Sequence, residues 1–432
     1  MKHVDASQTK TLTSTLSCYL KQARHSQLLK KASGITLGYI IAQLLLILST
    51  PILTRLYPPD AFAQLGYVMA FAALLLPAAS LRLEFAIPLT ENEQQASCLL
   101  LVSGLIVIAS SFVITGLLWL FHDLLNAYLA IDSTMLYCLF GIFILQGICQ
   151  ILRLHCIHQD RVGLVAHGKI IQNITMIAAQ LALIFVIPQA AIALIAGYLI
   201  GLVCNALYLM YKALGNVEFS KAALKLGPSL LKKYYKFPLH SSWTSVLDSA
   251  AAWVPVFFIG ILFGQTYAGI YFLVNRVFQI PTGLLATVLS QLLLKRFADC
   301  FRAQQSLQPL VKKSFLLLGS MGGAYLIGMY AIAPFLPWLF GANWNHSSLV
   351  LAIIAPAIVA AFCVSPLTNI FGVVGRNEIC SLWQILYLVM TAGAIGIGYL
   401  SGNFIIFLCA LAIAWVLSYI IYGILVYGVA KV

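Results

Sequence analysis

Two charged side chains of opposite sign, Asp248 and Arg276, interrupt long apolar stretches in the second half of this sequence. An ionisable group inside membrane hydrocarbon costs several kcal/mol, so it normally faces a bundle interior or a water-filled cavity. Counted along their stretches at 1.5 Å per residue, the two lie within about 6 Å in depth. They could line one site for a charged substrate, with Asp248 as a proton or cation site. They could instead form an ion pair that fixes helix register.

Polar residues repeat at helical spacing in four of the apolar stretches, so each stretch turns one hydrophilic face in one direction. The four stripes are Ser241, Thr244, Ser245 and Asp248; Arg276, Gln279, Gly283, Thr287 and Ser290; Lys169, Gln172, Asn173 and Gln180; and Thr36, Gln43 and Thr50. Four such faces can avoid the membrane hydrocarbon only if they surround a shared aqueous interior. We therefore expect a hydrophilic, cationic cavity with substrate contacts from Arg276, Asp248, Gln279, Lys169, Asn173 and Gln43.

Further charged and titratable residues stand where apolar stretches end. Arg82 and Glu84 follow the second stretch and are also candidates for the cavity, although interfacial side chains of this kind often extend to water or pair locally. His155 and His158 fall in what the sequence indicates is a hydrated loop, without the carboxylate cluster that would complete a metal site. We expect no catalytic residue, no bound metal and no cofactor.

The composition requires a membrane as solvent. Of 432 residues, 62% are hydrophobic and 9% are charged, whereas soluble domains carry roughly 25% charged residues. Apolar runs long enough to cross a hydrocarbon core of about 30 Å recur throughout the chain. We expect an all-α membrane protein of about twelve spans. The spans lie at roughly 34–54, 62–83, 97–121, 133–152, 165–187, 190–211, 241–263, 267–293, 314–340, 347–370, 379–400 and 403–427.

The net charge of +13 is distributed asymmetrically. With the N-terminus in the cytoplasm, all basic residues except Arg55 and Arg276 fall on the cytoplasmic side. The positive-inside rule therefore predicts a multi-pass protein of the inner membrane with both termini cytoplasmic. Basic loops against anionic membrane lipids also explain the charge without a nucleic-acid partner.

The expected organisation has two halves. A cytoplasmic tail (1–33) precedes a six-helix lobe (34–211), and a cytoplasmic linker (212–240) leads to a second six-helix lobe (241–427) and a short C-terminus (428–432). PILTRLYPPDAFAQLGY from Pro51 and PVFFIGILFGQTYAGIYF from Pro255 both run from a proline through a turn into a new helix. A six-helix repeat keeps its orientation, so the lobes should be related by a pseudo-two-fold axis along the membrane normal.

Five segments, spread over most of the chain, carry a family resemblance. They are PILTRLYPPDAFAQLGY, SLRLEFAIPL, KFPLHSSWTSVLDS, GIYFLVNRVFQIPTGLLATVLSQ and SPLTNIFGVVGRNE. In this order they resemble the Wzx-type O-antigen and capsular polysaccharide flippases. These form the polysaccharide-export branch of the superfamily that also contains multidrug and toxin extrusion (MATE) proteins.

The resemblance implies a MATE-like fold and export of an undecaprenyl-pyrophosphate-linked oligosaccharide to the periplasmic leaflet by alternating access. Coupling to H⁺ or Na⁺ stays open, and a polysaccharide polymerase with its chain-length machinery would be partners. Arg82 and Glu84 of an R-x-E segment and Arg276 of N-R-V-x-Q-x-P fall on motif positions. Asp248 stands where many members have an amide.

Three other functions compete with this one. An ion-coupled multidrug antiporter of the same fold would favour acidic cavity residues, whereas the intramembrane arginine suits an anionic substrate. A membrane polymerase or ligase would need larger outer loops than the sequence offers. A peptidoglycan-precursor flippase usually has two further helices.

Overall fold

The computed structural model describes residues 27–214, 227–234 and 242–431, and the regular structure in these ranges is helical. Eleven of the described helices are long and apolar enough to cross a membrane, and α2 (Gln27–Leu56) adds a further helix whose apolar part is Ile40–Leu56. The expected all-α membrane fold is confirmed. The predicted tail lies mostly, and the predicted linker partly, outside the described residues.

The first bundle consists of the helices before the predicted linker. Its long helices are α2, α3 (Pro59–Ala79), α4 (Glu93–Leu120), α6 (Ser133–His158), α7 (Val162–Leu183) and α8 (Ala190–Ala213). Three short elements accompany them, namely η1 (Leu83–Leu89), α5 (His122–Leu129) and α10 (Gly227–Lys233). Helix α7 packs along both α2 and α8, and α6 packs between α4 and α8.

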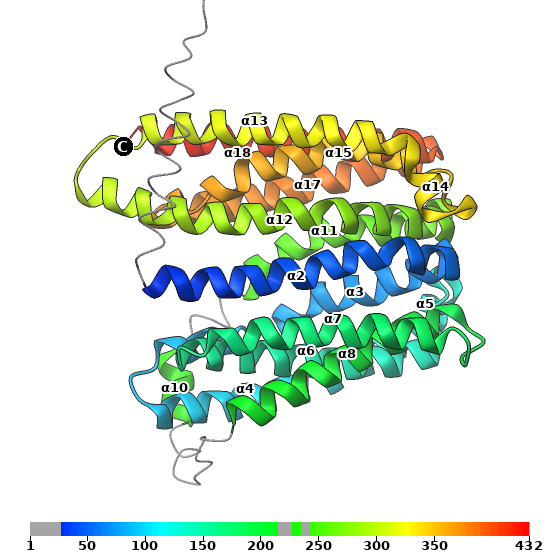
Figure 1. The fold of residues 1–432 in the computed structure, drawn as a ribbon, viewed down its shortest axis with the longest axis horizontal. Coiled ribbons are helices and arrows are strands. Elements are labelled where there is room, and N and C mark those ends of the chain that lie inside the picture. Colours follow the sequence, from blue (N-terminus) through cyan, green and yellow to red (C-terminus); the bar gives the residue numbers. More distant parts are fainter. Residues whose placement is uncertain (1–26, 215–226, 235–241, 432) are drawn as a thin grey trace, which may run out of the picture.

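The second bundle follows the predicted linker. Its long helices are α11 (Ser242–Phe263), α12 (Gln265–Arg302), α13 (Gln308–Ile332), α15 (Ser347–Val364), α17 (Asn377–Ser401) and α18 (Phe404–Val429). Its short elements are η3 (Ala333–Phe335), α14 (Leu336–Phe340), η4 (Ala342–Trp344), η5 (Ser365–Leu367) and α16 (Ile370–Val374). In Figure 1 the long helices of both bundles run side by side, and α3 packs against α11 and α12.

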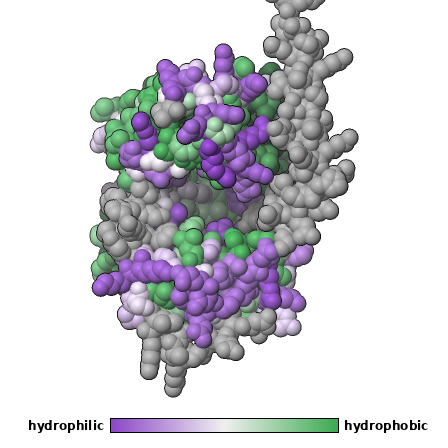
Figure 2. Space-filling model, turned by 90° about the vertical axis from the view of Figure 1, so that its left-hand side faces the viewer, coloured by the Kyte–Doolittle hydropathy of each residue, from purple (hydrophilic) through white to green (hydrophobic). Residues whose placement is uncertain are grey.

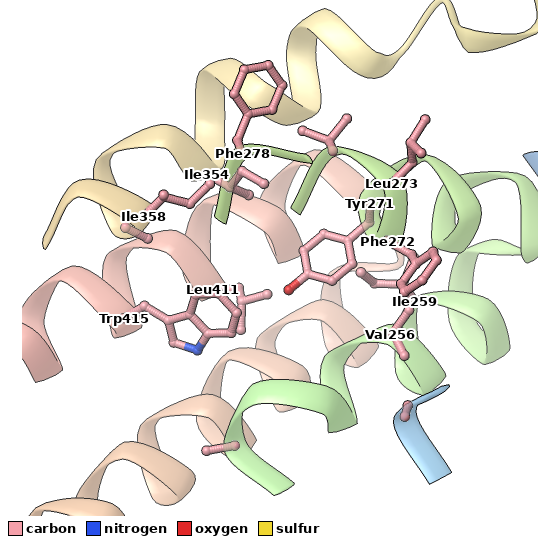
Figure 3. Close-up of a cluster of buried hydrophobic side chains, with 14 of the residues drawn as sticks. Val256, Ile259, Tyr271, Phe272, Leu273, Phe278, Ile354, Ile358, Leu411 and Trp415 are labelled. Atoms are coloured by element: carbon pink, nitrogen blue, oxygen red, sulfur yellow. The ribbon is translucent and has the colours of Figure 1, made fainter. Parts of the chain in front are cut away.

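A dense apolar core fills the second bundle. Figure 3 shows Tyr271 of α12 directed toward Leu411 and Trp415 of α18, with Val256 and Ile259 of α11 nearby. These side chains are almost fully buried. In a membrane such packing holds helices together by van der Waals contact rather than by exclusion of water.

Several boundaries differ from the expected ones. Helix α3 ends at Ala79, because Leu81 and Arg82 both adopt left-handed backbone angles. Arg82 is therefore the N-cap of η1 and Glu84 lies within η1, rather than at the end of a span. The span expected at 314–340 breaks after Ile332, where Pro334 and Pro337 cannot donate helical hydrogen bonds. The histidines expected in a hydrated loop lie in the last turns of α6, and His155 is 0% exposed.

The two ends of the molecule differ in how the bundles meet. The end that carries η1, the last turn of α6 and the start of α13 is here named the basic end, and Figure 2 shows a hollow between the bundles there. At the opposite end the bundles touch. The Thr266 hydroxyl donates to Asp60 (2.6 Å), and the indole N–H of Trp344 donates to the carbonyl of Thr54 (2.9 Å).

The two echoing turns of the sequence meet at this closed end. Gly269 approaches the carbonyl of Pro59 so closely that a Cβ atom at position 269 would overlap it. Gln64 also donates to Gln265 across the bundles (3.4 Å). The structure is therefore closed at the end opposite the basic end and open at the basic end.

Candidate substrate cavity

Polar side chains of α12 and α11 lie on accessible surface although both helices are otherwise apolar. Gln279, Gly283 and Thr287 follow one face of α12, and Asp248 is exposed on α11. Asp248 interacts electrostatically with Arg82 of the first bundle, so it faces the space between the bundles. The hollow of Figure 2 is consistent with this placement.

Arg276 extends from α12 toward the first bundle. It lines a narrow cavity of about 20 Å³, together with Ser49 and Thr50 of α2 and Gln180 of α7. The guanidinium carbon lies 5.8 Å from the centre of the Phe272 ring, a distance at which a cation and a ring attract. Arg276 is partly buried between two bundles, which makes it a candidate for binding an anion.

A second cation, Lys169 of α7, lies near Arg276 and repels it. The ammonium group donates to Oε1 of Gln172 (3.1 Å), which also accepts from the amide of Asn205 (3.2 Å). Arg153 of α6 adds a third positive charge that acts on Lys169. Like charges close together in a low dielectric repel one another, and a bound anion would reduce this repulsion.

Arg82, Glu84 and Arg153 form a charged cluster at the basic end. Glu84 is 2% exposed, and its Oε2 atom has no hydrogen-bond partner among the described residues. Arg153 donates to Oε1 of Gln150 (2.6 Å), while its Nε atom lacks a partner in the same part of the chain. The Arg82 guanidinium lies over the Phe85 ring, 4.8 Å from its centre.

Asp248 and Arg276 face different partners. Among the ion pairs of the described residues, none joins them. Asp248 interacts with Arg82, whereas Arg276 interacts with Lys169 and Tyr198. The geometry thus favours separate roles over a register-fixing ion pair.

Two residues of the α7 stripe hold helices together. The amide of Asn173 donates to the carbonyl of Ala42 on α2 (2.6 Å), and that of Gln180 donates to Leu194 of α8 (3.0 Å). Both side chains are almost fully buried, which favours helix packing over substrate contact. Gln43 is partly buried, and its Oε1 atom has no partner among the described residues. A substrate role for Gln43 therefore stays a prediction.

Residues 52–349 match the family described as polysaccharide biosynthesis protein, which is well over half of the chain. The chain belongs to this family. A curated relative, the succinoglycan biosynthesis transport protein ExoT of Rhizobium meliloti, is 27% identical over 164 residues. That match covers 36% of this chain and 32% of ExoT, so it spans only about a third of the relative.

Solved structures of membrane transporters share the fold. An inward-facing multidrug resistance MATE family transporter of the MOP superfamily has a TM-score of 0.66 at 14% identity, covering 92% of this chain and 99% of its own. The lipid II flippase MurJ, in an inward closed conformation, has a TM-score of 0.68 at 14% identity, with coverages of 90% and 86%. A MOP superfamily transporter from Pyrococcus furiosus has a TM-score of 0.64 at 15% identity, with coverages of 93% and 95%. The expected MATE-like fold is confirmed.

Arg153 was not among the residues predicted for the cavity. An arginine at the end of an apolar run is also a topology signal, and Arg153 was interpreted only in that way. The available signal was Gln150, one helical turn before it, which continues a polar face into the bundle. Nothing in the sequence indicated a functional role for the aromatic residues near Asp248, since tyrosines and tryptophans are common throughout apolar runs.

Replacing Glu84 by glutamine tests the charge state of the cluster at the basic end. Burial raises the pKa of Glu84, although Ser80, Arg82 and Arg153 oppose the shift. A raised folded-state pKa means that the ionised carboxylate is penalised in the fold, so stability is lost as pH rises from the unfolded pKa through the folded one. We expect the melting temperature of Glu84→Gln, relative to the native protein, to rise between about pH 5 and about pH 8.

Thermal unfolding in detergent, followed by tryptophan fluorescence, measures this difference. The opposite trend, with the native protein gaining stability over Glu84→Gln as pH rises, would mean that the two arginines outweigh burial and keep the carboxylate ionised.

Proposed function

We propose that this protein is a flippase that moves an undecaprenyl-pyrophosphate-linked oligosaccharide from the cytoplasmic to the periplasmic leaflet of the bacterial inner membrane. One observation carries the proposal. A member of the polysaccharide biosynthesis family holds Arg276 and Arg153 within electrostatic reach of Lys169, with Arg276 in a narrow cavity between the bundles.

The chemistry of the substrate suits this arrangement. A sugar pyrophosphate cannot cross hydrocarbon unaided, so a hydrophilic passage must shield it while the polyprenyl chain stays in lipid. Arginine binds phosphate oxygens through paired hydrogen bonds, and the guanidinium keeps its charge when partly buried. An anionic headgroup would also relieve the repulsion among the three cations.

The direction of transport follows from the distribution of charge. By the positive-inside rule the basic end faces the cytoplasm, together with both termini. The structure would then be the cytoplasm-open state, in which the substrate enters, and opening of the closed end would release it to the periplasm. A proton or sodium gradient, or consumption of the product by a polysaccharide polymerase and its chain-length machinery, would drive the cycle.

Two relatives support a transporter rather than an enzyme. ExoT is named a transport protein, and MurJ is a flippase of the same fold. The described outer segments offer little for bond chemistry, so this chain would move its substrate without changing a covalent bond and without a cofactor. A multidrug antiporter is the alternative function, because the MATE-like fold is shared with a multidrug resistance transporter.

Reconstitution in proteoliposomes tests the proposal. Native protein should move a fluorescent undecaprenyl-pyrophosphate oligosaccharide between leaflets faster than protein-free vesicles do, with the sugar composition unchanged afterwards. A parallel assay follows ethidium movement under imposed proton and sodium gradients. Ethidium transport without flipping across several glycans would replace the flippase by a drug antiporter.

A further inference from the structure

Asp248 belongs to a wall of tyrosines on the second-bundle side of the hollow. It is exposed, and among the described residues it makes no hydrogen bond or ion pair. Its carboxylate lies within electrostatic reach of Tyr387 on α17 and of Tyr419 and Tyr422 on α18. Three helices thus bring an accessible carboxylate near three tyrosines, of which Tyr387 and Tyr422 are almost fully buried.

A stack of aromatic rings fixes this wall. Trp383 lies parallel to Tyr422 at 4.0 Å and to Tyr387 at 5.1 Å, measured between ring centres. Its indole N–H donates to the carbonyl of Ser418 (2.8 Å), which joins α17 to α18. Tyr419 packs against the Trp383 ring at 5.4 Å and is the partly exposed member. The wall is therefore preorganised, and Tyr419 keeps part of its surface accessible.

The opposite wall has a different chemistry. Arg153 and Lys169 belong to the first bundle, and Arg276 extends toward it from α12. These cations interact with one another and with Tyr198, whereas Asp248 interacts with Arg82 and with the tyrosines. The hollow is therefore polarised, with excess positive charge on one side and a carboxylate with hydroxyls on the other.

We propose that the two walls contact different parts of the substrate. Asp248 and Tyr419 bind the glycan and select neutral or amino sugars over uronic acids, while Arg276 and Lys169 bind the pyrophosphate. The inference rests on the proposed function and assigns a substrate class within it. The glycan would lie against α11, α17 and α18.

Hydrogen bonding and packing explain why this wall suits sugars. Sugar hydroxyls and ammonium or amide groups donate to a carboxylate in charge-assisted hydrogen bonds, and phenol hydroxyls both donate and accept. The apolar C–H face of a pyranose packs against an aromatic ring such as that of Tyr419. A uronic acid would place a second carboxylate beside Asp248, and like charges in a low dielectric repel strongly. Such repulsion is an effective source of specificity.

Binding of three probes to the purified full chain in nanodiscs tests whether one wall binds the glycan and the other binds the pyrophosphate. The probes are undecaprenyl pyrophosphate alone, the same lipid bearing an oligosaccharide of neutral hexoses and N-acetylhexosamines, and the same lipid bearing a uronic acid in that oligosaccharide. The native protein should prefer the neutral glycan lipid over the other two. Asp248→Asn should weaken neutral glycan binding by about tenfold, the effect of one charge-assisted hydrogen bond.

Variants in each wall distinguish the contribution of one wall to substrate binding from that of the other. Asp248→Asn should also strengthen binding of the uronate lipid and leave the bare lipid unchanged, whereas Arg276→Ala should weaken all three. Tyr419→Ala should lose more glycan affinity than Tyr419→Phe, which keeps the ring. Tyr399→Ala on α17 removes an exposed tyrosine remote from Asp248 and serves as the control.

Each remaining outcome counts against the inference. Asp248→Asn that weakens the bare lipid as much as the glycan lipids would assign Asp248 to the headgroup. A variant that loses only sodium or proton dependence, with the same glycan preference, would make it a coupling site. Native protein that binds the bare lipid but does not distinguish glycans would refute the inference alone, whereas failure to bind any of the three would refute the proposed function.

Discussion

Flipping of the lipid-linked oligosaccharide is expected to fall about 10- to 100-fold when Arg276 is replaced by alanine, the effect of losing one or two charged hydrogen bonds. Arg276 lines the cavity between α12 and the first bundle, and water cannot fully replace a partly buried guanidinium there. Arg276→Lys should recover part of the rate, because an ammonium keeps the charge but loses the paired geometry.

Arg302→Ala is the matched control. Arg302 lies on the same helix, is exposed, and forms an ion pair with Asp299 at 3.3 Å. Rates are measured in proteoliposomes at equal amounts of folded protein, judged by gel filtration. Equal loss in Arg302→Ala, or a normal rate in Arg276→Ala, would remove Arg276 from the substrate site.

Locking the closed end is expected to stop flipping completely and reversibly. Asp60 and Thr266 join the bundles there through a hydrogen bond of 2.6 Å, so cysteines at both positions should be linked by a short, reducible bis-methanethiosulfonate reagent. Alternating access requires this end to open, and a covalent bridge prevents the opening. Reduction should restore the rate.

The experiment needs a background in which the ten native cysteines are replaced by serine or alanine. Each single-cysteine variant, treated with the same reagent, controls for modification without bridging. Full flipping by the bridged protein would show that the contact between Asp60 and Thr266 is not part of the moving interface.

The sequence predicted the helices well because their signals are local. Hydropathy and span length depend on neighbouring residues only, and α8, expected at 190–211, spans Ala190–Ala213. The ends were less predictable where backbone angles decide them, as at Leu81 and Arg82. The family was also readable from the sequence, since its motifs are contiguous segments.

The depth of a residue in the membrane could be predicted from the sequence, but the direction of its side chain around the helix could not. Asp248 and Arg276 were expected at similar depth, and nothing in their spacing revealed that one faces Arg82 and the other Lys169. The direction of each side chain depends on which helices neighbour α11 and α12. Packing across the whole bundle decides which helices these are.

A polar stripe has the same appearance whether it lines water or binds a neighbouring helix. The stripe of α7 contains Lys169, which lies within electrostatic reach of Arg276, while Asn173 and Gln180 donate to backbone carbonyls of α2 and α8. Polar side chains serve both purposes in membranes, so only the packed structure separates them.

The sequence by itself therefore determined the solvent, the helices and the family, because each follows from composition or from contiguous segments. Only the tertiary structure decided which charges interact, that Arg153 acts on Lys169, and that Asp248 lies within electrostatic reach of Tyr387 and Tyr419. These residues are far apart in the chain, and their contacts arise only when α6, α7, α11, α17 and α18 pack in one arrangement.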